Sequence, residues 1–209
     1  MPRGRTALFL ACGAWLGLRA WAALRPTAFP YLARPVLDLP RPLITRGGLL
    51  KILEPAPGER MLEVGPGTGY YTLPVAARLQ PGGLLEVLEV RQSYLDHTLE
   101  RARKAGLANV LPRLGDGAQL PYPSGRFDAA YLVTVLGEIP DPQAALHELR
   151  RVLKPGGRLV VGEIFIDPDF PRLTWLVRRA RAAGLMLDRR TGIPLAYFAR
   201  FRAEPNVER

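Results

Sequence analysis

The chain of 209 residues has a single cysteine, Cys12, and only two histidines, His97 and His147. One thiol excludes an internal disulfide framework and a zinc cluster built from cysteines. Two histidines so far apart in the sequence do not suggest a metal site, so no metal is expected. With 48% hydrophobic and 23% charged residues, the composition is that of an ordinary globular protein. The length fits one well-packed domain with an appendage.

The middle of the chain lacks an excess of positive charge, although the whole chain carries a net charge of +10. Residues 55–169 hold twelve basic and fourteen acidic side chains, against eight and two in residues 1–54 and nine and three in residues 170–209. No zinc-finger, helix-turn-helix or aromatic RNA-binding signature accompanies these basic ends. They fit contact with an anionic surface at least as well as a DNA-binding face, and ordinary solvated arginines are the third interpretation. We expect no nucleic-acid partner.

A long uninterrupted hydrophobic run is also missing, but the N-terminus comes close to one. Thirteen uncharged residues from Thr6 to Leu18 follow two arginines. A membrane-spanning helix needs about 20 apolar residues. That length is reached here only by including Arg19, which costs on the order of 2.5–3.5 kcal/mol at mid-membrane and less near the segment's end, where its side chain reaches the interface. Residues 1–25 are therefore predicted to form an apolar helix, which is a candidate membrane anchor.

Two other interpretations of this N-terminal segment remain open, a helix packed on the domain and a cleaved signal peptide. The prolines from Pro26 to Pro42 interrupt any helix. Residues 26–47 are therefore predicted to form an extended linker or lid.

From Arg60 onward, short apolar runs alternate with segments of helical spacing, which predicts parallel βαβ units and an open, doubly wound sheet. Asp141 and Pro142 mark the start of the third helix, and the run Pro155-Gly156-Gly157 marks its end. The predicted strands cover residues 61–64, 84–90, 109–114, 127–135 and 158–166, and the predicted helices cover residues 70–79, 93–106, 141–157 and 173–184. The runs 185–190 and 195–203 predict a C-terminal antiparallel hairpin.

The stretch MLEVGPGTGYY places Gly65, Gly67 and Gly69 directly after the first predicted strand. In doubly wound sheets, ligands bind beyond the carboxyl ends of the strands, and glycines there allow positive φ and close approach to the backbone. The spacing differs from the G-x-G-x-x-G pattern of dinucleotide-binding dehydrogenases. An acid such as Glu63 suits a cationic or zwitterionic ligand group. Tight packing of the turn is the alternative interpretation of the glycines.

Two further acids follow neighbouring strands. Glu89 ends the second strand, where a carboxylate can accept hydrogen bonds from both hydroxyls of a ribose. Glu86 lies earlier on that strand and is less expected to reach the cleft. Asp116 follows the third strand, where it can accept from an adenine amino group or form an Asx turn. Together these residues favour a ligand that contains a nucleoside.

The segments LEVGPGTG, GDGAQLPYPSGRFDAAY and ELRRVLKPGGRLVVGE occur in this order between about residues 48 and 165. In these segments the chain resembles the class I S-adenosylmethionine-dependent methyltransferases, specifically the small-molecule type known as methyltransferase type 11. The resemblance implies a Rossmann-like, mostly parallel seven-stranded sheet over residues 48–209 and S-adenosylmethionine as the cofactor. It also implies an enzyme of the methyltransferase class, EC 2.1.1.

The resemblance implies a role for each matching residue. The methionine part of the cofactor would lie near the first strand, and Glu89 would hold the ribose. Asp116 and the Gly117 backbone would contact the adenine, and Thr134 would lie beneath the sulfonium side. Relatives often have Asp at the ribose position and a His-rich segment where this chain has VLGEIPD, which leaves the acceptor side open. Glu138 is the candidate catalytic residue in that segment, as a base for an acceptor that loses a proton, and capping of the next helix is its alternative role. The residues expected to line the methionine part are Glu63, Gly65, Gly67, Thr68 and Gly69.

The acceptor is expected to contact residues 1–47 and the segment from residue 167 onward, which are arginine-rich. A small, lipophilic or membrane-associated acceptor suits such a lid, either a phospholipid amine or a quinone- or phenol-like ring. Because the cofactor is cytosolic, we expect a cytoplasmic domain that an N-terminal helix tethers to the inner face of the membrane. The alternative is a non-catalytic, methyltransferase-like binding protein that acts through its basic termini.

Overall fold

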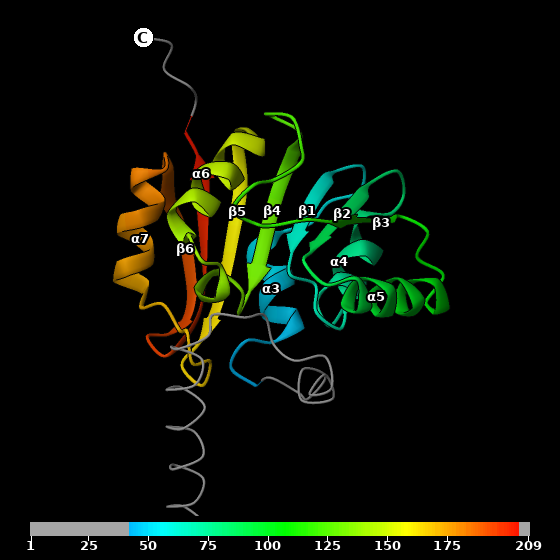
Figure 1. The fold of residues 1–209 in the computed structure, drawn as a ribbon, viewed down its shortest axis with the longest axis horizontal. Helices are drawn as coiled ribbons and strands as arrows, with labels where there is room; N and C mark the ends of the chain where they lie inside the picture. Colours follow the sequence, from blue (N-terminus) through cyan, green and yellow to red (C-terminus); the bar gives the residue numbers. More distant parts are fainter. Residues whose placement is uncertain (1–41, 205–209) are drawn as a thin grey trace, which may run out of the picture.

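A computed structural model of the chain describes residues 42–204. The predicted helix over residues 1–25 and most of the predicted linker lie outside the described residues. In the described part, seven strands form one sheet in the order β3-β2-β1-β4-β5-β7-β6 (Figure 1). The strands are β1 Arg60–Val64, β2 Leu84–Glu89, β3 Val110–Leu114, β4 Phe127–Val133, β5 Leu153–Ile164, β6 Leu185–Ile193 and β7 Ala196–Ala203.

Strands β1 to β5 run parallel, whereas β7 runs antiparallel to β5 and β6 antiparallel to β7. This confirms the mostly parallel, doubly wound sheet and the C-terminal hairpin. The chain builds β1, β2 and β3 in one direction and then returns to place β4 on the other side of β1. The switch point at which ligands bind such sheets therefore lies at the carboxyl ends of β1 and β4.

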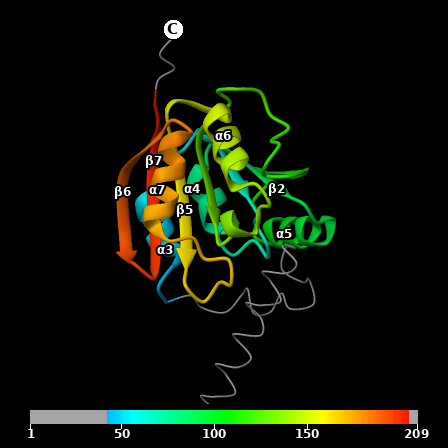
Figure 2. The same cartoon turned by 60° about the vertical axis from the view of Figure 1, so that its left-hand side comes forward.

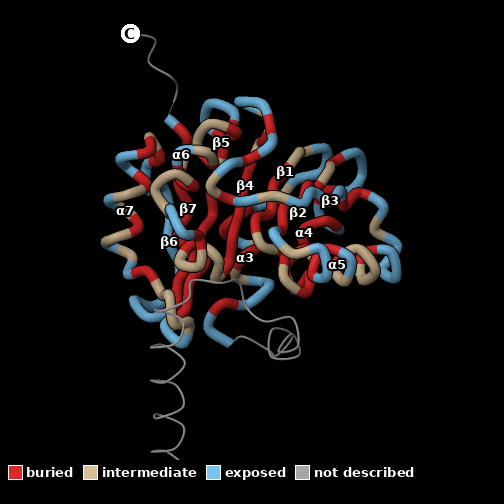
Figure 3. The backbone as a smooth tube through the Cα atoms, viewed as in Figure 1, coloured by how far each residue is buried: buried red, intermediate tan, exposed pale blue. Residues whose placement is uncertain are grey.

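Helices cover both faces of the sheet (Figure 2). On one face, α3, α4 and α5 bury their apolar sides against the strands, and on the other face α6 and α7 do so. Figure 3 shows the resulting core, with buried residues concentrated in the central strands. The helices are α3 Arg46–Leu53, α4 Thr72–Leu79, α5 Gln92–Lys104, the 3-10 turn η2 Leu136–Glu138, α6 Pro142–Val152 and α7 Leu173–Ala182.

Helix α6 begins where the sequence predicts and ends earlier. The Asp141 carboxylate accepts hydrogen bonds from the backbone N–H groups of Gln143 (3.1 Å) and Ala144 (2.9 Å), so it caps the helix. The predicted end at Pro155-Gly156-Gly157 is wrong, because α6 ends at Val152 and these residues belong to β5. A proline disfavours helical backbone in the residue before it, so the helix has to end upstream of Pro155.

Helix α3 begins at Arg46, inside the segment that the sequence assigns to the linker. The Thr45 hydroxyl accepts a hydrogen bond from the Gly48 N–H at 3.0 Å and caps this helix. Its buried side chains, Leu49, Ile52 and Leu53, pack on the sheet face that α4 and α5 also cover. The described end of the N-terminal segment is therefore fixed to the domain.

Candidate active site at the carboxyl ends of the parallel strands

The loop after β1 adopts a backbone that requires glycine. Gly65, Gly67 and Gly69 have φ values of 70°, 55° and 80°, a region that side chains with a Cβ rarely adopt. A Cβ on Gly65 would also lie 2.5 Å from a Val135 methyl carbon, and one on Gly69 would lie 3.2 Å from Thr98 Cγ2. Positive φ and tight packing therefore both operate in this loop, and neither interpretation of the glycines excludes the other.

Glu63 lies on β1, two residues before the glycine loop, and its side chain is buried. Its Oε2 accepts a hydrogen bond from the Thr72 hydroxyl at 2.5 Å, and the Tyr131 side chain lies beside it. Burial raises the pKa of Glu63 to about 7, and the hydrogen bonds lower this pKa only in part. Among the residues that the structure describes, the charged group that acts on Glu63 is another acid, Glu89, rather than a cation. A ligand ammonium group would supply the missing counter-charge.

Glu89 is the last residue of β2, and its carboxylate is fixed by backbone donors. Oε1 accepts hydrogen bonds from the Val90 N–H at 2.9 Å and the Arg91 N–H at 3.1 Å, and the Gly67 N–H also interacts with this carboxylate. Burial raises the pKa of Glu89, and these three N–H groups oppose that shift. The structure therefore brings Glu63, Glu89 and the glycine loop together.

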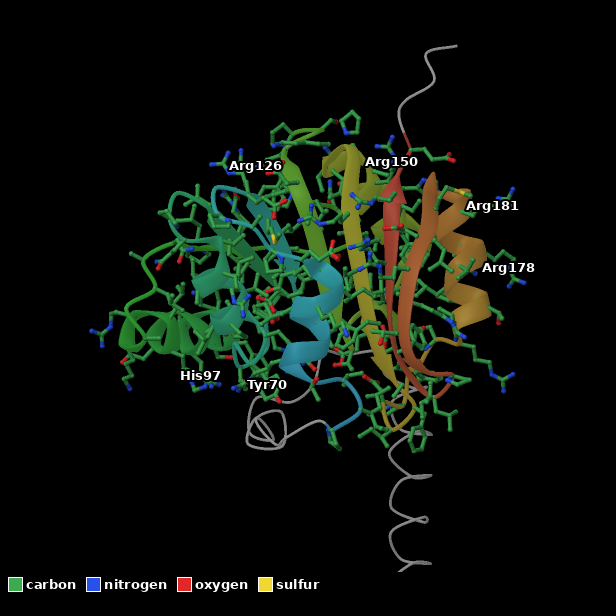
Figure 4. All side chains as sticks on the ribbon, turned by 180° about the vertical axis from the view of Figure 1, so that it is seen from behind. Tyr70, His97, Arg126, Arg150, Arg178 and Arg181 are labelled. Carbon is green, nitrogen blue, oxygen red and sulfur yellow. The ribbon has the colours of Figure 1, made fainter. Side chains whose placement is uncertain are left out.

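Glu86 does not join this group, as the sequence predicts. It is bound to the guanidinium groups of Arg126 at 2.7 Å and Arg60 at 3.5 Å. Figure 4 shows Arg126 at the opposite end of the sheet from Tyr70, which follows the glycine loop. Glu89 reaches the glycine loop and Glu86 does not, because Glu89 ends the strand and Glu86 lies three residues earlier on it.

Asp116 forms the Asx turn that the sequence leaves open as its alternative role. Its Oδ1 accepts a hydrogen bond from the Ala118 N–H at 2.8 Å. The Gly115 N–H donates to the Glu89 carbonyl at 3.0 Å, so this loop lies beside the end of β2. Gly117 is buried, and a Cβ at this position would lie only 2.9 Å from Ile139 Cδ1. The turn thus holds the Gly117 backbone at the same edge of the sheet as the glycine loop.

Thr134 leaves the sheet in a strained conformation. Its φ of 56° is unusual for a residue other than glycine, and its N–H donates to the Gly162 carbonyl at 2.8 Å. Strand β4 therefore ends at Val133, two residues earlier than predicted, and η2 follows directly. Thr68, the other predicted threonine, is buried inside the glycine loop, where its carbonyl accepts a hydrogen bond from Arg101 at 2.7 Å.

The segment after β4 carries Glu138 at the end of η2, and this side chain is half-buried. Burial raises the pKa of Glu138 to about 8, and the charges of Asp167, Asp169 and Glu89 add to that shift. Arg91 is the cation that opposes it. The cap of α6 is Asp141 rather than Glu138, so Glu138 is not used as a helix cap.

Sequence reasoning missed Glu163, the residue before the last one of β5. Its side chain is 1% exposed, and among the described residues its Oε1 has no hydrogen-bond partner. Burial raises the pKa of Glu163 well above its usual range, and Asp167 and Glu138 add to this shift. One signal could have identified it, because Glu63, Glu89 and Glu163 are each an acid within one residue of the carboxyl end of a buried strand.

Two observations concern metal binding and membrane crossing by the described residues. Among residues 42–204, no group of His, Cys, Asp and Glu side chains is arranged to hold a metal ion. Within the same range, none of the helices combines the length and the hydrophobicity that a membrane crossing needs.

An open depression of about 460 Å³ lies between α7 and β6. Arg178 and Arg181 of this region project outward from α7 (Figure 4). Since β6 is the sheet edge remote from β1 and β2, this depression is separate from the glycine loop.

Comparisons with known proteins show which family the chain is similar to. Residues 62–161 match the family described as "Methyltransferase domain". The nocamycin O-methyltransferase of Saccharothrix syringae is 35% identical over 57% of this chain and 42% of the relative. The ubiquinone/menaquinone biosynthesis C-methyltransferase of Cereibacter sphaeroides is 34% identical over 64% and 53%, respectively. The chain spans about half the length of the curated relatives it matches.

Solved structures confirm the fold. A SAM-dependent methyltransferase from Aquifex aeolicus superposes with a TM-score of 0.76 at 21% identity, covering 84% of this chain and all of that chain. The [4+2]-cyclase SpnF superposes with a TM-score of 0.69 at 22% identity, covering 76% and 79%. Because a methyltransferase and a [4+2]-cyclase share this architecture, the fold alone does not identify a reaction.

Proposed function

We propose that this chain is a class I S-adenosylmethionine-dependent methyltransferase and that it transfers a methyl group from S-adenosylmethionine to a small, lipophilic acceptor; the match of residues 62–161 to the methyltransferase-domain family and the names of the relatives support this. One observation carries this proposal. Two buried carboxylates, Glu63 and Glu89, lie beside the glycine loop at the switch point of the sheet, and within residues 42–204 no cation is paired with Glu63. Such a site fits a ligand that offers an ammonium group and ribose hydroxyls.

The residues present fit this cofactor. Glu63 would hold its amino group, Glu89 its ribose, and the Gly117 backbone with Asp116 its adenine, while Thr134 would lie near the sulfonium. The bound cofactor supplies an already activated methyl group, so the main task of the protein is to align the acceptor and to exclude water. A base is needed only where the acceptor loses a proton.

The N-terminal segment supports a role next to the site. The Tyr71 hydroxyl donates a hydrogen bond to the Ile44 carbonyl at 2.5 Å, and the Arg46 guanidinium lies 3.9 Å from the centre of the Tyr70 ring. Both tyrosines directly follow the glycine loop. Residues 42–45, which precede α3, therefore lie beside the cofactor region, where a lid over a lipophilic acceptor would sit.

For the acceptor we propose either a phospholipid amine or a quinone- or phenol-like ring. The names of several relatives, which describe ubiquinone/menaquinone and demethylmenaquinone methyltransferases, support the ring. The arginine-rich segments at both ends of the chain support a lipid with an anionic headgroup.

A direct test uses full-length protein, S-adenosylmethionine with a labelled methyl group, and three acceptors: phosphatidylethanolamine vesicles, a decyl-substituted hydroquinone and a total lipid extract. We expect label in an organic-extractable product, and loss of this transfer in Glu89→Gln. The matched control is Asp96→Asn, because Asp96 is an exposed acid on α5 that accepts a hydrogen bond from Gln92. If the cofactor binds and no acceptor is labelled, the alternative of a binding protein is favoured.

We further propose that residues 1–25 tether a cytoplasmic domain to the inner face of the membrane. The support is the apolar run from Thr6 to Leu24 in the sequence. Cell fractionation of the full chain and of a version that lacks residues 1–25 tests this. Membrane recovery of the full chain alone is expected, and soluble recovery of both forms would contradict the tether.

A further inference from the structure

Four acids gather at the carboxyl ends of β4 and β5, on the acceptor side of the cofactor region. They are Glu138 in η2, Glu163 in β5, and Asp167 and Asp169 in the loop before α7. The loop packs directly on η2, because a Cβ added to Gly137 would lie 2.8 Å from the Asp169 Cβ. Two loops that are distant in sequence thus bring these acids together.

Glu163 is the member of this cluster that has an unsatisfied polar atom for a ligand to bind. A buried carboxyl oxygen without a hydrogen-bond partner is costly, and Glu163 Oε1 is such an atom among the described residues. The Leu136 N–H interacts with the carboxylate from one side. Because the neighbouring Gly162 carbonyl accepts from the Thr134 N–H at 2.8 Å, Glu163 lies next to the residue expected near the sulfonium.

Among residues 42–204, most of the charged groups that act on Glu138 and Glu163 are acids. Asp167 and Asp169 act on both Glu138 and Glu163, and Glu138 also acts on Glu163. Glu89 adds to the effect on Glu138, and Arg91 opposes it. Such a field repels an anionic nucleophile such as a phenolate and attracts a cation. The same field would stabilise positive charge that develops on an acceptor atom.

We propose that Glu138 and Glu163, with Asp167 and Asp169 beside them, form an acceptor subsite for a primary or secondary amine that arrives as an ammonium ion. This inference rests on the proposed function and selects an amine among its acceptors. A carboxylate accepts the proton that the ammonium ion has to lose. The nitrogen lone pair then forms the N–C bond while the methyl carbon's bond to sulfur breaks and leaves its electron pair on sulfur. The nitrogen becomes positively charged again, so the acids face a cation both before and after transfer.

Titration calorimetry on the full chain tests the subsite without turnover. The protein is first saturated with S-adenosylhomocysteine, and then titrated with n-octylamine, 1-octanol or octanoate, which share one tail and differ in headgroup charge. We expect octylamine to bind at least about tenfold more tightly than octanol, and octanoate to be the weakest of the three.

Variants locate the effect. Glu163→Gln and Glu138→Gln are each expected to weaken octylamine binding about tenfold or more while S-adenosylhomocysteine binding stays within about twofold, which also shows that the variant is folded. Asp96→Asn, the exposed control on α5, is expected to change neither affinity.

Two results would overturn the inference and leave the proposed function in place: equal affinities for octylamine and octanol, or unchanged octylamine binding in both glutamine variants. Absence of S-adenosylhomocysteine binding by the wild-type chain would overturn the proposed function and this inference with it.

Discussion

Replacing Glu63 with glutamine is predicted to stabilise the ligand-free protein relative to wild type as the pH rises. Burial raises the pKa of Glu63 from its ordinary 4.5 to about 7. Between these values the folded state holds a proton that the unfolded state has released, so wild-type stability falls as the pH rises. The stabilising contribution is complete below pH 4.5 and is lost as the pH passes through about 7. A shift of this size corresponds to roughly 3 kcal/mol, and glutamine removes it.

The assay is urea unfolding of wild type and Glu63→Gln across pH 4.5 to 8.5, and the quantity of interest is the difference between their free energies of unfolding. Titrating groups that do not interact with Glu63 are common to both proteins and cancel in this difference. The difference is expected to move by roughly 3 kcal/mol in favour of the variant over this range. A difference that stays constant with pH would refute the reasoning.

The same substitution is predicted to weaken binding of S-adenosylhomocysteine. An ammonium group would lose a charge-assisted hydrogen bond, which corresponds to about tenfold or more in affinity. The matched control is Glu86→Gln, one strand away. It leaves the Arg126 guanidinium without its carboxylate partner at 2.7 Å, so it is expected to lower stability at neutral pH and to leave ligand affinity unchanged. A gain in stability together with a loss of binding is therefore the signature expected for Glu63.

Three further substitutions test the rest of the site. Gly65→Ala combines a φ of 70° with a 2.5 Å approach of the new Cβ to Val135, so it should destabilise the protein by about 2–4 kcal/mol in urea unfolding. Adding Val135→Ala should restore only part of this loss, because the backbone strain remains. An unchanged stability of Gly65→Ala would mean that the loop does not require glycine. Glu89→Gln keeps an oxygen for the backbone donors but replaces the other one with an amide, so calorimetry should show S-adenosylhomocysteine affinity reduced about tenfold or more, whereas unchanged affinity would remove Glu89 from the ribose site. Tyr71→Phe leaves the Ile44 carbonyl unpaired, and a loss of about 1–3 kcal/mol in the unfolding free energy is expected, with an unchanged value arguing against this contact.

The sequence predicts the fold well because its signals are local. Apolar runs separated by helical spacing are sufficient to identify the parallel strands, and Asp141 before Pro142 marks the start of α6. Glycine spacing predicts the positive φ of the loop after β1, since glycine is the residue that adopts it without strain. The end of α6 is less local, because Leu153 already pairs with Phe127 in the sheet.

The acceptor side could not be predicted in the same way. Glu163 is one acid in an apolar run, and its unpaired oxygen and acidic neighbours exist only because η2 folds against the loop that carries Asp167 and Asp169. The left-handed backbone of Thr134 has no sequence signal either, because a β-branched residue rarely adopts it. The geometry of the acceptor side therefore depends on contacts between segments that are far apart in the sequence, which the residue pattern alone does not predict.

Thermal unfolding of the full chain with S-adenosylmethionine, S-adenosylhomocysteine or NAD tests the central claim most directly. A ligand at about 100 times its dissociation constant adds about 2.7 kcal/mol of stability, which for a domain of this size raises the midpoint by roughly 5 °C or more. The account predicts this shift with both sulfur nucleosides and none with NAD. An unchanged midpoint at millimolar concentrations of both sulfur nucleosides would contradict it.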